Sequence, residues 1–145
     1  MSQFRKLTEQ VSVSPQITTA DIDEAAASGV ELIINNRPDG EEMGQPTNDE
    51  LSAYAEGKGI KWAHIPIVSG QVTMEAISIT SSTLRDADKI LAYCRSGTRS
   101  CNMWGLAVAY AGSEETTDII TKAEAAGYDL SGMASTFKHL HGTED

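Results

Sequence analysis

Short apolar runs alternate along this chain with stretches whose apolar residues recur at helical spacing. Three of the runs are good strand candidates, namely residues 30–35, 60–67 and 89–94. Between the last two, residues 73–87 place their apolar side chains on one stripe of a helix. Strands that alternate with helices are typical of a sheet covered by helical layers. The sequence therefore predicts an α/β fold.

The remaining segments fit the same layering. Residues 11–15 predict a short first strand at a sheet edge, and Thr18 or Thr19 can cap the helix that follows. Thr47-x-x-Glu50 has the pattern of a capping box that opens another helix. The helices expected in the C-terminal part cover residues 101–111, which are apolar on nearly all sides and therefore central, 114–126 and 130–140.

Charge and length narrow the class of protein. The 145 residues include 11 Lys and Arg against 21 Asp and Glu, so the formal charge is −10. A surface for nucleic acid or an anionic membrane needs clustered cations, so both are poor partners. The chain has no long apolar run, its first ten residues lack the apolar core of a signal peptide, and two cysteines make no disulfide framework. We expect a single catalytic domain over residues 1–145, located in the cytoplasm.

The segment around Cys94 carries the clearest sign of chemistry. Cys94 ends a predicted strand, the polar residues Arg95, Ser96, Gly97 and Thr98 follow, and a helix comes next. A loop that wraps from a strand into a helix turns several backbone N–H groups inward, and the helix dipole adds to their positive field. Gly97 allows backbone conformations that a Cβ would resist. We expect this loop to bind an anion and to stabilise a thiolate at its base.

Two side chains after the loop extend this interpretation. Arg99 offers a guanidinium that can bind two oxygens of an oxyanion at once, and the hydroxyl of Ser100 is expected to donate to the Cys94 sulfur. A nucleophilic thiol inside an anion-binding ring predicts covalent catalysis through a cysteinyl intermediate. Arg95 lies at the rim of this ring, where it selects an anionic substrate or has only a surface role. A buried structural cysteine is the alternative, and the compact Gly, Arg and Ser spacing disfavours it.

Four stretches of the chain resemble known enzymes. They are residues 13–18 (V-S-P-Q-I-T), 34–41 (I-N-N-R-P-D-G-E), 65–67 (I-P-I) and 92–104. The last resembles the cysteine loops of tyrosine and dual-specificity phosphatases and of rhodanese-type sulfurtransferases. In this order the four resemble the bacterial phosphatase-like family named after beta-lactamase-hydrolase-like proteins.

The resemblance implies a dual-specificity-phosphatase-like fold, with a central, mostly parallel sheet of four to five strands flanked by helices. It also implies that Cys94 is the nucleophile and that Arg99 binds the oxyanion. Members of this family occur fused to, or encoded beside, persulfide-oxidising enzymes of the metallo-beta-lactamase type. The resemblance therefore implies such an enzyme as a partner.

Phosphoryl transfer and sulfur transfer make different demands on the loop. Four residues separate Cys94 from Arg99, whereas tyrosine phosphatases have five. One residue fewer shortens the ring by at most about 3.5 Å of contour, which suits one sulfane sulfur better than a phosphoryl group. Those phosphatases also carry an aspartic acid about 30 residues before the cysteine as general acid. Here the equivalent segment, 65–71, has no carboxylate, and Tyr93 stands where they have histidine.

These departures favour a sulfurtransferase of the rhodanese type, which passes sulfur through a persulfide on Cys94. The alternative is a phosphatase that hydrolyses aryl phosphates, including phosphotyrosine, through a phosphocysteine. An aryl oxide leaves with little help from an acid, so this alternative stays open. In either case the expected substrate is a small anion, a sulfane sulfur donor or an aryl phosphate.

Three residues outside the loop are candidates for a substrate or acid role. His64, just before residues 65–71, and Asp39, in the turn after the strand predicted over residues 30–35, are candidates to replace the missing acid. Arg37 follows a strand in a turn-rich segment, where it contacts the substrate or braces the loop through Asp39. A solvent-exposed ion pair between Arg37 and Asp39 is the alternative. The neighbouring Glu41 and Glu42 are interpreted as solvated loop residues.

The other potential metal ligands and thiols predict no further site. His64, His139 and His141 are the only histidines, and no cluster of cysteines or carboxylates completes a site around them. We therefore predict no metal and no cofactor. Cys101, seven residues after Cys94, is expected to be buried in the core rather than to act as a resolving thiol.

Overall fold

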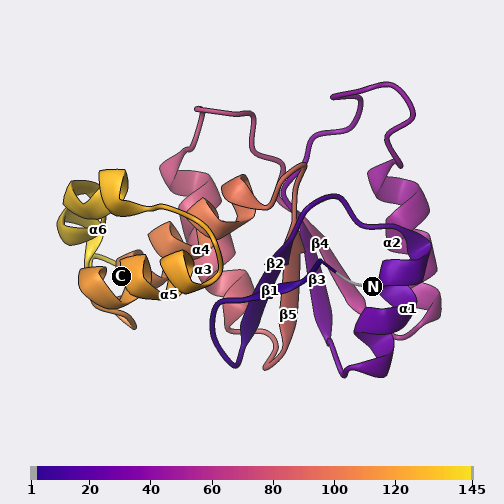
Figure 1. Cartoon of the computed structure of the whole chain (residues 1–145), viewed down its shortest axis with the longest axis horizontal. Coiled ribbons are helices and arrows are strands. Elements are labelled where there is room, and N and C mark those ends of the chain that lie inside the picture. Colours follow the sequence, from indigo (N-terminus) through magenta and orange to yellow (C-terminus); the bar gives the residue numbers. More distant parts are fainter. Residues whose placement is uncertain (1–2, 145) are drawn as a thin grey trace.

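The computed structural model describes residues 3–144. In these residues five strands form one sheet in the order β1-β2-β5-β3-β4, with helices on both faces (Figure 1). The strands are β1 (Arg5–Lys6), β2 (Val11–Ser14), β3 (Leu32–Asn35), β4 (Lys61–His64) and β5 (Ile90–Tyr93). The helices are α1 (Thr19–Ala27), α2 (Asn48–Gly57), α3 (Met74–Leu84), α4 (Thr98–Ala111), α5 (Thr116–Ala125), the 3-10 turn η1 (Ser131–Met133) and α6 (Ala134–Leu140).

The four longer strands are parallel, and only β1 runs antiparallel to its neighbour β2. The predicted α/β fold with a mostly parallel sheet is therefore confirmed. The prediction that residues 11–15 lie at the sheet edge is wrong, because β1 pairs with β2 on its outer side. β1 has two residues, both charged and exposed, so it lacks the apolar run that identifies a strand in a sequence.

Two apolar cores lie on opposite faces of the sheet. In β3, Leu32 and Ile34 pack with the residues of α3, α4, α5 and α6, whereas Ile33 packs with α1 and α2. β5 alternates in the same way. Every residue of β3 and β5 is buried, as expected for central parallel strands covered on both faces. Figure 1 shows these two helical layers on either side of the sheet.

Local signals set the ends of several helices. Thr18 caps α1 in a reciprocal capping box with Asp21, and the Thr47 side chain accepts the backbone N–H of Glu50 at the start of α2. The strand expected over residues 60–67 is shorter in the structure, where β4 covers only Lys61–His64. Pro66 has no N–H to continue the ladder.

Helix α4 is the central helix that the sequence predicts. Nine of its fourteen residues are buried, and it packs against α3, α5, α6 and the sheet. It begins at Thr98, three residues earlier than expected, because Gly97 acts as its N-cap. This early start places Arg99 in the first turn of the helix, next to Cys94.

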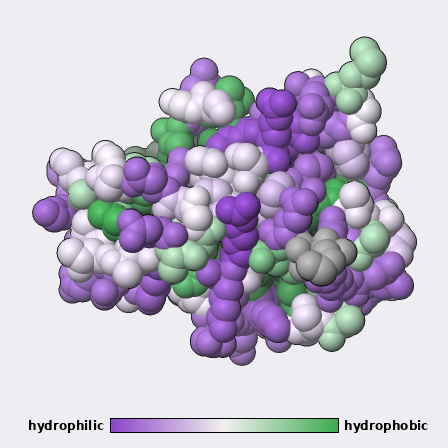
Figure 2. Space-filling view, in the orientation of Figure 1, coloured by the Kyte–Doolittle hydropathy of each residue, from purple (hydrophilic) through white to green (hydrophobic). Residues whose placement is uncertain are grey.

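The surface is largely polar, as expected for a chain with a formal charge of −10. The face seen in Figure 2 is mostly hydrophilic, with small and separate apolar patches. Within residues 3–144, no helix combines the length and the hydropathy required to cross a bilayer.

Candidate active site

The candidate site lies at the carboxyl edge of the parallel strands. β5 stands between β2 and β3, so the residues that follow it are at the centre of this edge. Cys94 comes directly after β5, and Asn36 and Arg37 come directly after β3. Ligands of open α/β sheets bind outside the carboxyl ends of the strands. We call residues 94–99 the Cys94 loop.

The sulfur of Cys94 faces polar groups. Cys94 is fully buried, yet it belongs to neither apolar core. Its Sγ accepts a hydrogen bond from the backbone N–H of Gly97 at 3.1 Å, and its own N–H donates to the carbonyl of Ser14 at 3.3 Å. Gly97 has a φ of 93°, a left-handed conformation that favours glycine. The thiol thus lies at the start of α4, where backbone N–H groups stabilise negative charge.

Arg99 is held beside this thiol by two acceptors. Its Nη1 donates to the carbonyl of Ile67 at 2.8 Å. Nη1 and Nη2 donate to the two carboxylate oxygens of Glu41 at 2.7 and 2.8 Å. The pKa of Arg99 is raised mainly by Glu41, with a smaller contribution from the nearby Cys94 sulfur. The fork of Arg99 that would bind an oxyanion is therefore occupied by a carboxylate of the protein itself.

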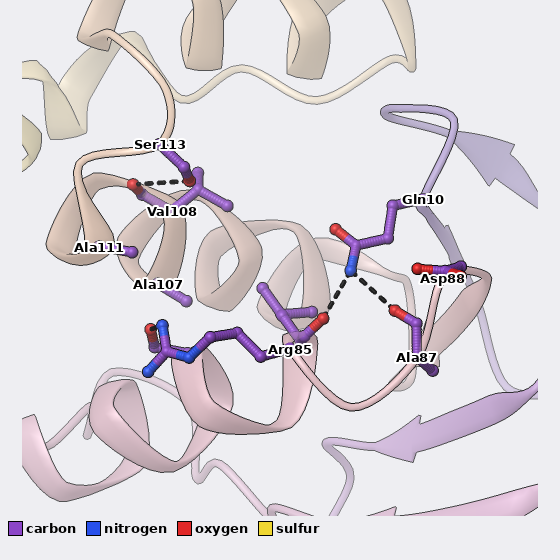
Figure 3. A pocket seen from close by; sticks show the side chains of 10 residues that line it. Gln10, Arg85, Ala87, Asp88, Ala107, Val108, Ala111 and Ser113 are labelled. Carbon is purple, nitrogen blue, oxygen red and sulfur yellow. Dashed lines mark hydrogen bonds between the residues drawn. The ribbon is translucent and has the colours of Figure 1, made fainter.

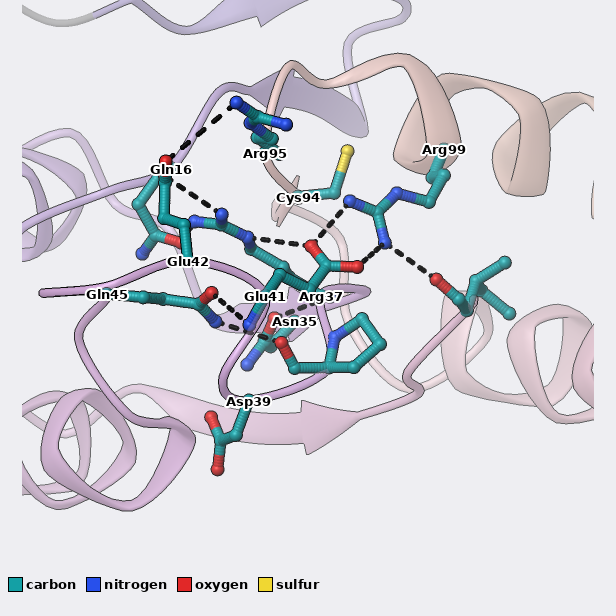
Figure 4. Close-up of polar contacts among 12 residues, drawn as sticks. Gln16, Asn35, Arg37, Asp39, Glu41, Glu42, Gln45, Cys94, Arg95 and Arg99 are labelled. Atoms are coloured by element: carbon teal, nitrogen blue, oxygen red, sulfur yellow. Dashed lines mark hydrogen bonds and ion pairs between the residues drawn. The ribbon is translucent and has the colours of Figure 1, made fainter. Parts of the chain in front are cut away.

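Glu41 lies between two guanidinium groups, as Figure 4 shows. Besides its two bonds to Arg99, its Oε1 accepts from Nε of Arg37 at 2.9 Å. The hydrogen bonds from Arg99, followed by those from Arg37, outweigh burial and lower the pKa of Glu41 from 4.5 to about 2. Glu41 is therefore ionised throughout the neutral range. Glu41 is an exposed loop residue, as interpreted, but its carboxylate is paired with two guanidinium groups, which the sequence did not predict.

Arg37 is an internal residue. Its side chain is 1% exposed, and its Nη1 and Nη2 donate to Gln16 at 2.9 Å and to Glu42 at 3.0 Å. A buried charge needs partners of this kind, because leaving it unpaired costs several kcal/mol. The alternative of a solvent-exposed ion pair between Arg37 and Asp39 is wrong, because Arg37 is buried and its described ion pairs are with Glu41 and Glu42.

Neither candidate for a replacement acid faces the Cys94 loop. Asp39 is exposed, and its Oδ1 accepts the N–H of Asn48 at the start of α2, at 2.8 Å. In Figure 4 its carboxylate points away from Arg37 and Glu41. His64 is exposed at the end of β4, where its Nε2 lies 3.2 Å from the carbonyl of Arg37.

Ser100 differs from the sequence prediction as well. Its Oγ donates to Oδ1 of Asn36 at 2.9 Å instead of to the Cys94 sulfur. Asn36 is itself fixed, since its N–H donates to the carbonyl of Tyr93 at 2.8 Å and its Nδ2 to the carbonyl of Ile65 at 2.9 Å. Ser100 therefore joins α4 to the ends of β3, β4 and β5. The hydrogen bond that the Cys94 sulfur does accept comes from the backbone of Gly97.

The remaining loop residues line an open pocket. Arg95 is exposed at its rim, 3.8 Å from Glu42, and the Oγ of Ser96 accepts the N–H of Thr98 at 3.3 Å. The residues that line this pocket are Glu41, Ser69, Gly70, Arg95, Ser96, Thr98, Arg99 and Asn102. Cys101 is buried, as predicted, and burial raises the pKa of its thiol to about 12.

The pairing of Glu41 makes a prediction about stability and pH. Glu41 titrates near 4.5 when unpaired and near 2 in the folded protein. The stabilisation is therefore fully present above pH 4.5 and is lost as the pH falls toward 2. We expect the unfolding free energy of the native protein to exceed that of Glu41→Gln at pH 7, and this difference to shrink steadily between pH 4.5 and 3. Urea unfolding at several pH values measures it.

A matched control is Glu24→Gln, a change at an exposed position of α1 for which the structure describes no ion pair. That variant should differ little from the native protein at every pH. A difference between the native protein and Glu41→Gln that stays constant from pH 7 to pH 3 would contradict the pairing.

Fold and site together define a class. A thiol at the end of a central parallel strand, a short loop and an arginine in the first turn of the next helix form the framework of cysteine-based phosphatases. Residues 3–112 match the family described as "Beta-lactamase hydrolase-like protein, phosphatase-like domain". The chain belongs to this family, which confirms the resemblance seen in the sequence.

Curated relatives carry the same description. A beta-lactamase hydrolase-like protein of Agrobacterium fabrum is 31% identical over 126 residues, which are 86% of this chain and 29% of that protein. A second, from Xylella fastidiosa, is 30% identical over 132 residues, 90% of this chain and 30% of that protein. The chain thus spans less than a third of the length of these relatives.

Solved structures agree on the fold. The crystal structure of a candidate phosphatase from Neisseria meningitidis is 31% identical, with a TM-score of 0.83 over 97% of this chain and all of that one. Kinase-associated phosphatase has a TM-score of 0.71 at 16% identity, over 95% of this chain and 90% of that one. At this lower identity the likeness shows the fold alone, and it confirms the dual-specificity-phosphatase-like architecture.

Proposed function

We propose that this domain hydrolyses aryl phosphomonoesters through a phosphocysteine on Cys94. The observation that carries the proposal is the buried Cys94 sulfur, which accepts the Gly97 N–H at the start of the same helix whose first turn holds the Arg99 guanidinium. A thiolate held there is stabilised by both groups, and the same groups can bind phosphoryl oxygens. Membership of the phosphatase-like family supports the same activity.

The proposed reaction has two steps, formation of the phosphocysteine and its hydrolysis. In the first, the thiolate of Cys94 attacks phosphorus, an S–P bond forms, and the P–O bond breaks to release an aryl oxide, which takes a proton from water. In the second, water attacks the phosphocysteine, and the S–P bond breaks to give inorganic phosphate and the thiolate. Arg99 binds the equatorial oxygens in both steps.

The substrate must replace Glu41 on Arg99. The carboxylate holds both Nη atoms of Arg99 at 2.7 and 2.8 Å, which is the arrangement an oxyanion would take. Glu41 keeps its hydrogen bond from the buried Arg37 when it moves aside. A protein carboxylate thus competes with the substrate for the same fork, and only an anion that binds more tightly displaces it.

The absence of a proton donor selects the leaving group. Glu41 is ionised, with a pKa of about 2, and residues 65–73 contain no carboxylate. Aryl oxides leave as anions far more readily than alkoxides. The proposed substrates are therefore aryl phosphates, including phosphotyrosine, rather than alkyl phosphates.

Sulfur transfer is the second candidate, and the sequence alone favours it. Four residues lie between Cys94 and Arg99, a ring that suits a single sulfane sulfur. Here the Cys94 thiolate attacks the outer sulfur of thiosulfate, sulfite leaves, and the persulfide passes its sulfur to an acceptor thiol. A persulfide-oxidising partner enzyme belongs to this second candidate.

One experiment compares the two candidates. Turnover of 4-nitrophenyl phosphate, phenyl phosphate and an alkyl phosphate is measured beside thiosulfate with cyanide as acceptor. We expect turnover of the phosphates to fall steeply as the leaving group becomes more basic, and thiosulfate to react at most weakly. Cys94-dependent turnover of thiosulfate without that of any aryl phosphate would replace the proposal by sulfur transfer. No Cys94-dependent turnover of either class would contradict both.

A further inference from the structure

Tyr128 contacts the Cys94 loop from a part of the chain outside the family match, which ends at residue 112. It lies beyond the end of α5, and its side chain is largely buried. The Tyr128 hydroxyl donates to the backbone carbonyl of Ser96 at 3.1 Å. This carbonyl belongs to the same peptide unit as the N–H of Gly97, which donates to the Cys94 sulfur at 3.1 Å.

One peptide plane thus connects Tyr128 with the thiol. In a trans peptide the C=O and the N–H point in opposite directions, and no described peptide is cis. Tyr128 holds the oxygen on the outer side of the loop, so the N–H is directed inward. We propose that Tyr128 is a positioning residue, which keeps the Ser96–Gly97 peptide turned so that its N–H serves the Cys94 thiolate and the bound anion. This inference rests on the proposed role of Cys94.

The Ser96–Gly97 peptide needs an external restraint. Gly97, on one side of it, has a φ of 93°, and glycine crosses between backbone regions at little cost. The Ser96 side chain is engaged with Thr98, so it does not hold the carbonyl. A flipped peptide would point the Ser96 oxygen at the sulfur and would repel both a thiolate and an anionic substrate.

Tyr128 is itself well fixed. Its N–H donates to the carbonyl of Ala123 at 2.9 Å, and the guanidinium of Arg5 lies 5.3 Å from the centre of its ring. A Cβ at residue 97 would lie only 2.1 Å from the Tyr128 hydroxyl oxygen, so the hydroxyl fills the space beside the glycine. Burial raises the pKa of Tyr128 above its usual value, and the hydroxyl keeps the proton that it donates.

The test is Tyr128→Phe, which removes the hydroxyl and keeps the ring against Gly97. We expect kcat for an aryl phosphate to fall about tenfold or more, as the loss of one oriented hydrogen bond allows. We also expect the rate of alkylation of Cys94 by iodoacetamide, followed on the Cys94 peptide by mass spectrometry, to reach its half-maximum at a higher pH. Urea unfolding verifies that the variant is folded.

The control is Tyr110→Phe, the same change near the end of α4, where the ring packs against the core and no described hydrogen bond involves the Tyr110 hydroxyl. Its kcat and its alkylation profile should match those of the native protein. If Tyr128→Phe also leaves both unchanged, the positioning role is wrong. A third outcome is that kcat falls and the unfolding free energy falls with it, while the pH of half-maximal alkylation does not change. In that case Tyr128 has only a structural role, and the inference is overturned.

The alkylation arm keeps this test separate from the proposed function. It reports on the Cys94 thiolate whether or not aryl phosphates are substrates. A native protein without phosphatase activity would contradict the proposed function, while a changed alkylation profile of Tyr128→Phe would still support the positioning role.

Discussion

Replacement of Cys94 by serine should abolish turnover of 4-nitrophenyl phosphate, with a loss of at least about a thousandfold in kcat. A serine hydroxyl fits the same space and can still accept the hydrogen bond that Gly97 donates to the sulfur. The serine hydroxyl is not ionised near neutral pH, however. The N–H of Gly97 and the guanidinium of Arg99 cannot make it an effective nucleophile. Initial rates of nitrophenol release measure the effect.

Cys101→Ala is the matched control for this variant. Cys101 is buried, and its thiol stays protonated because burial raises its pKa to about 12. We expect the Cys101→Ala protein to keep turnover within a few-fold of the native rate. Turnover that survives Cys94→Ser, or that disappears in Cys101→Ala while the protein stays folded, would show that the reacting thiol has been assigned to the wrong residue.

Arg99→Lys should lower kcat/KM by about a hundredfold to a thousandfold. The guanidinium of Arg99 presents two donors in a fixed fork, which now hold the two oxygens of Glu41 and would hold two oxygens of a phosphoryl group. A lysine ammonium is a single point charge and cannot replace that fork. Because the fork acts most strongly on the transition state, most of the loss should be in kcat, measured by steady-state kinetics with 4-nitrophenyl phosphate.

Arg85→Lys provides the control, because Arg85 forms a similar two-pronged pair with Glu144, at 2.8 Å for both nitrogens. Arg85 lines a separate pocket between the ends of α3 and α4, shown in Figure 3, away from the Cys94 loop. Activity should remain near the native value in this variant. Equal losses in Arg85→Lys and Arg99→Lys would mean that Arg99 acts through stability alone.

Much of the fold is readable in the sequence because its signals are local. β3 and β5 are continuous apolar runs, and Thr18 and Thr47 mark the starts of α1 and α2 within a few residues. β1 is not readable, because its two charged residues become a strand only by pairing with β2. Its existence depends on a tertiary contact rather than on its own composition.

The candidate site, like the fold, could be predicted from the sequence only in part. The Cys94 loop is readable because strand, thiol, glycine and helix follow each other within a short segment. Glu41 is not, because it is 58 positions from Arg99 in the sequence and only the fold brings the two residues together. Its one sequence signal is its place at the end of residues 34–41, a stretch that resembles the phosphatase-like family. Ser100 was misassigned because its direction depends on the earlier start of α4, which turns its hydroxyl toward Asn36.

The most direct measurement is the mass of the Cys94 peptide after the reaction is stopped rapidly with acid. With 4-nitrophenyl phosphate present, the peptide should gain about 80 Da, the mass of one phosphoryl group, and the Cys101→Ala variant should show the same gain. A gain of about 32 Da with thiosulfate, and none with the phosphate, would instead identify a sulfur carrier. An unmodified Cys94 peptide while the substrate is being consumed, or an adduct on another residue, would contradict covalent catalysis by Cys94.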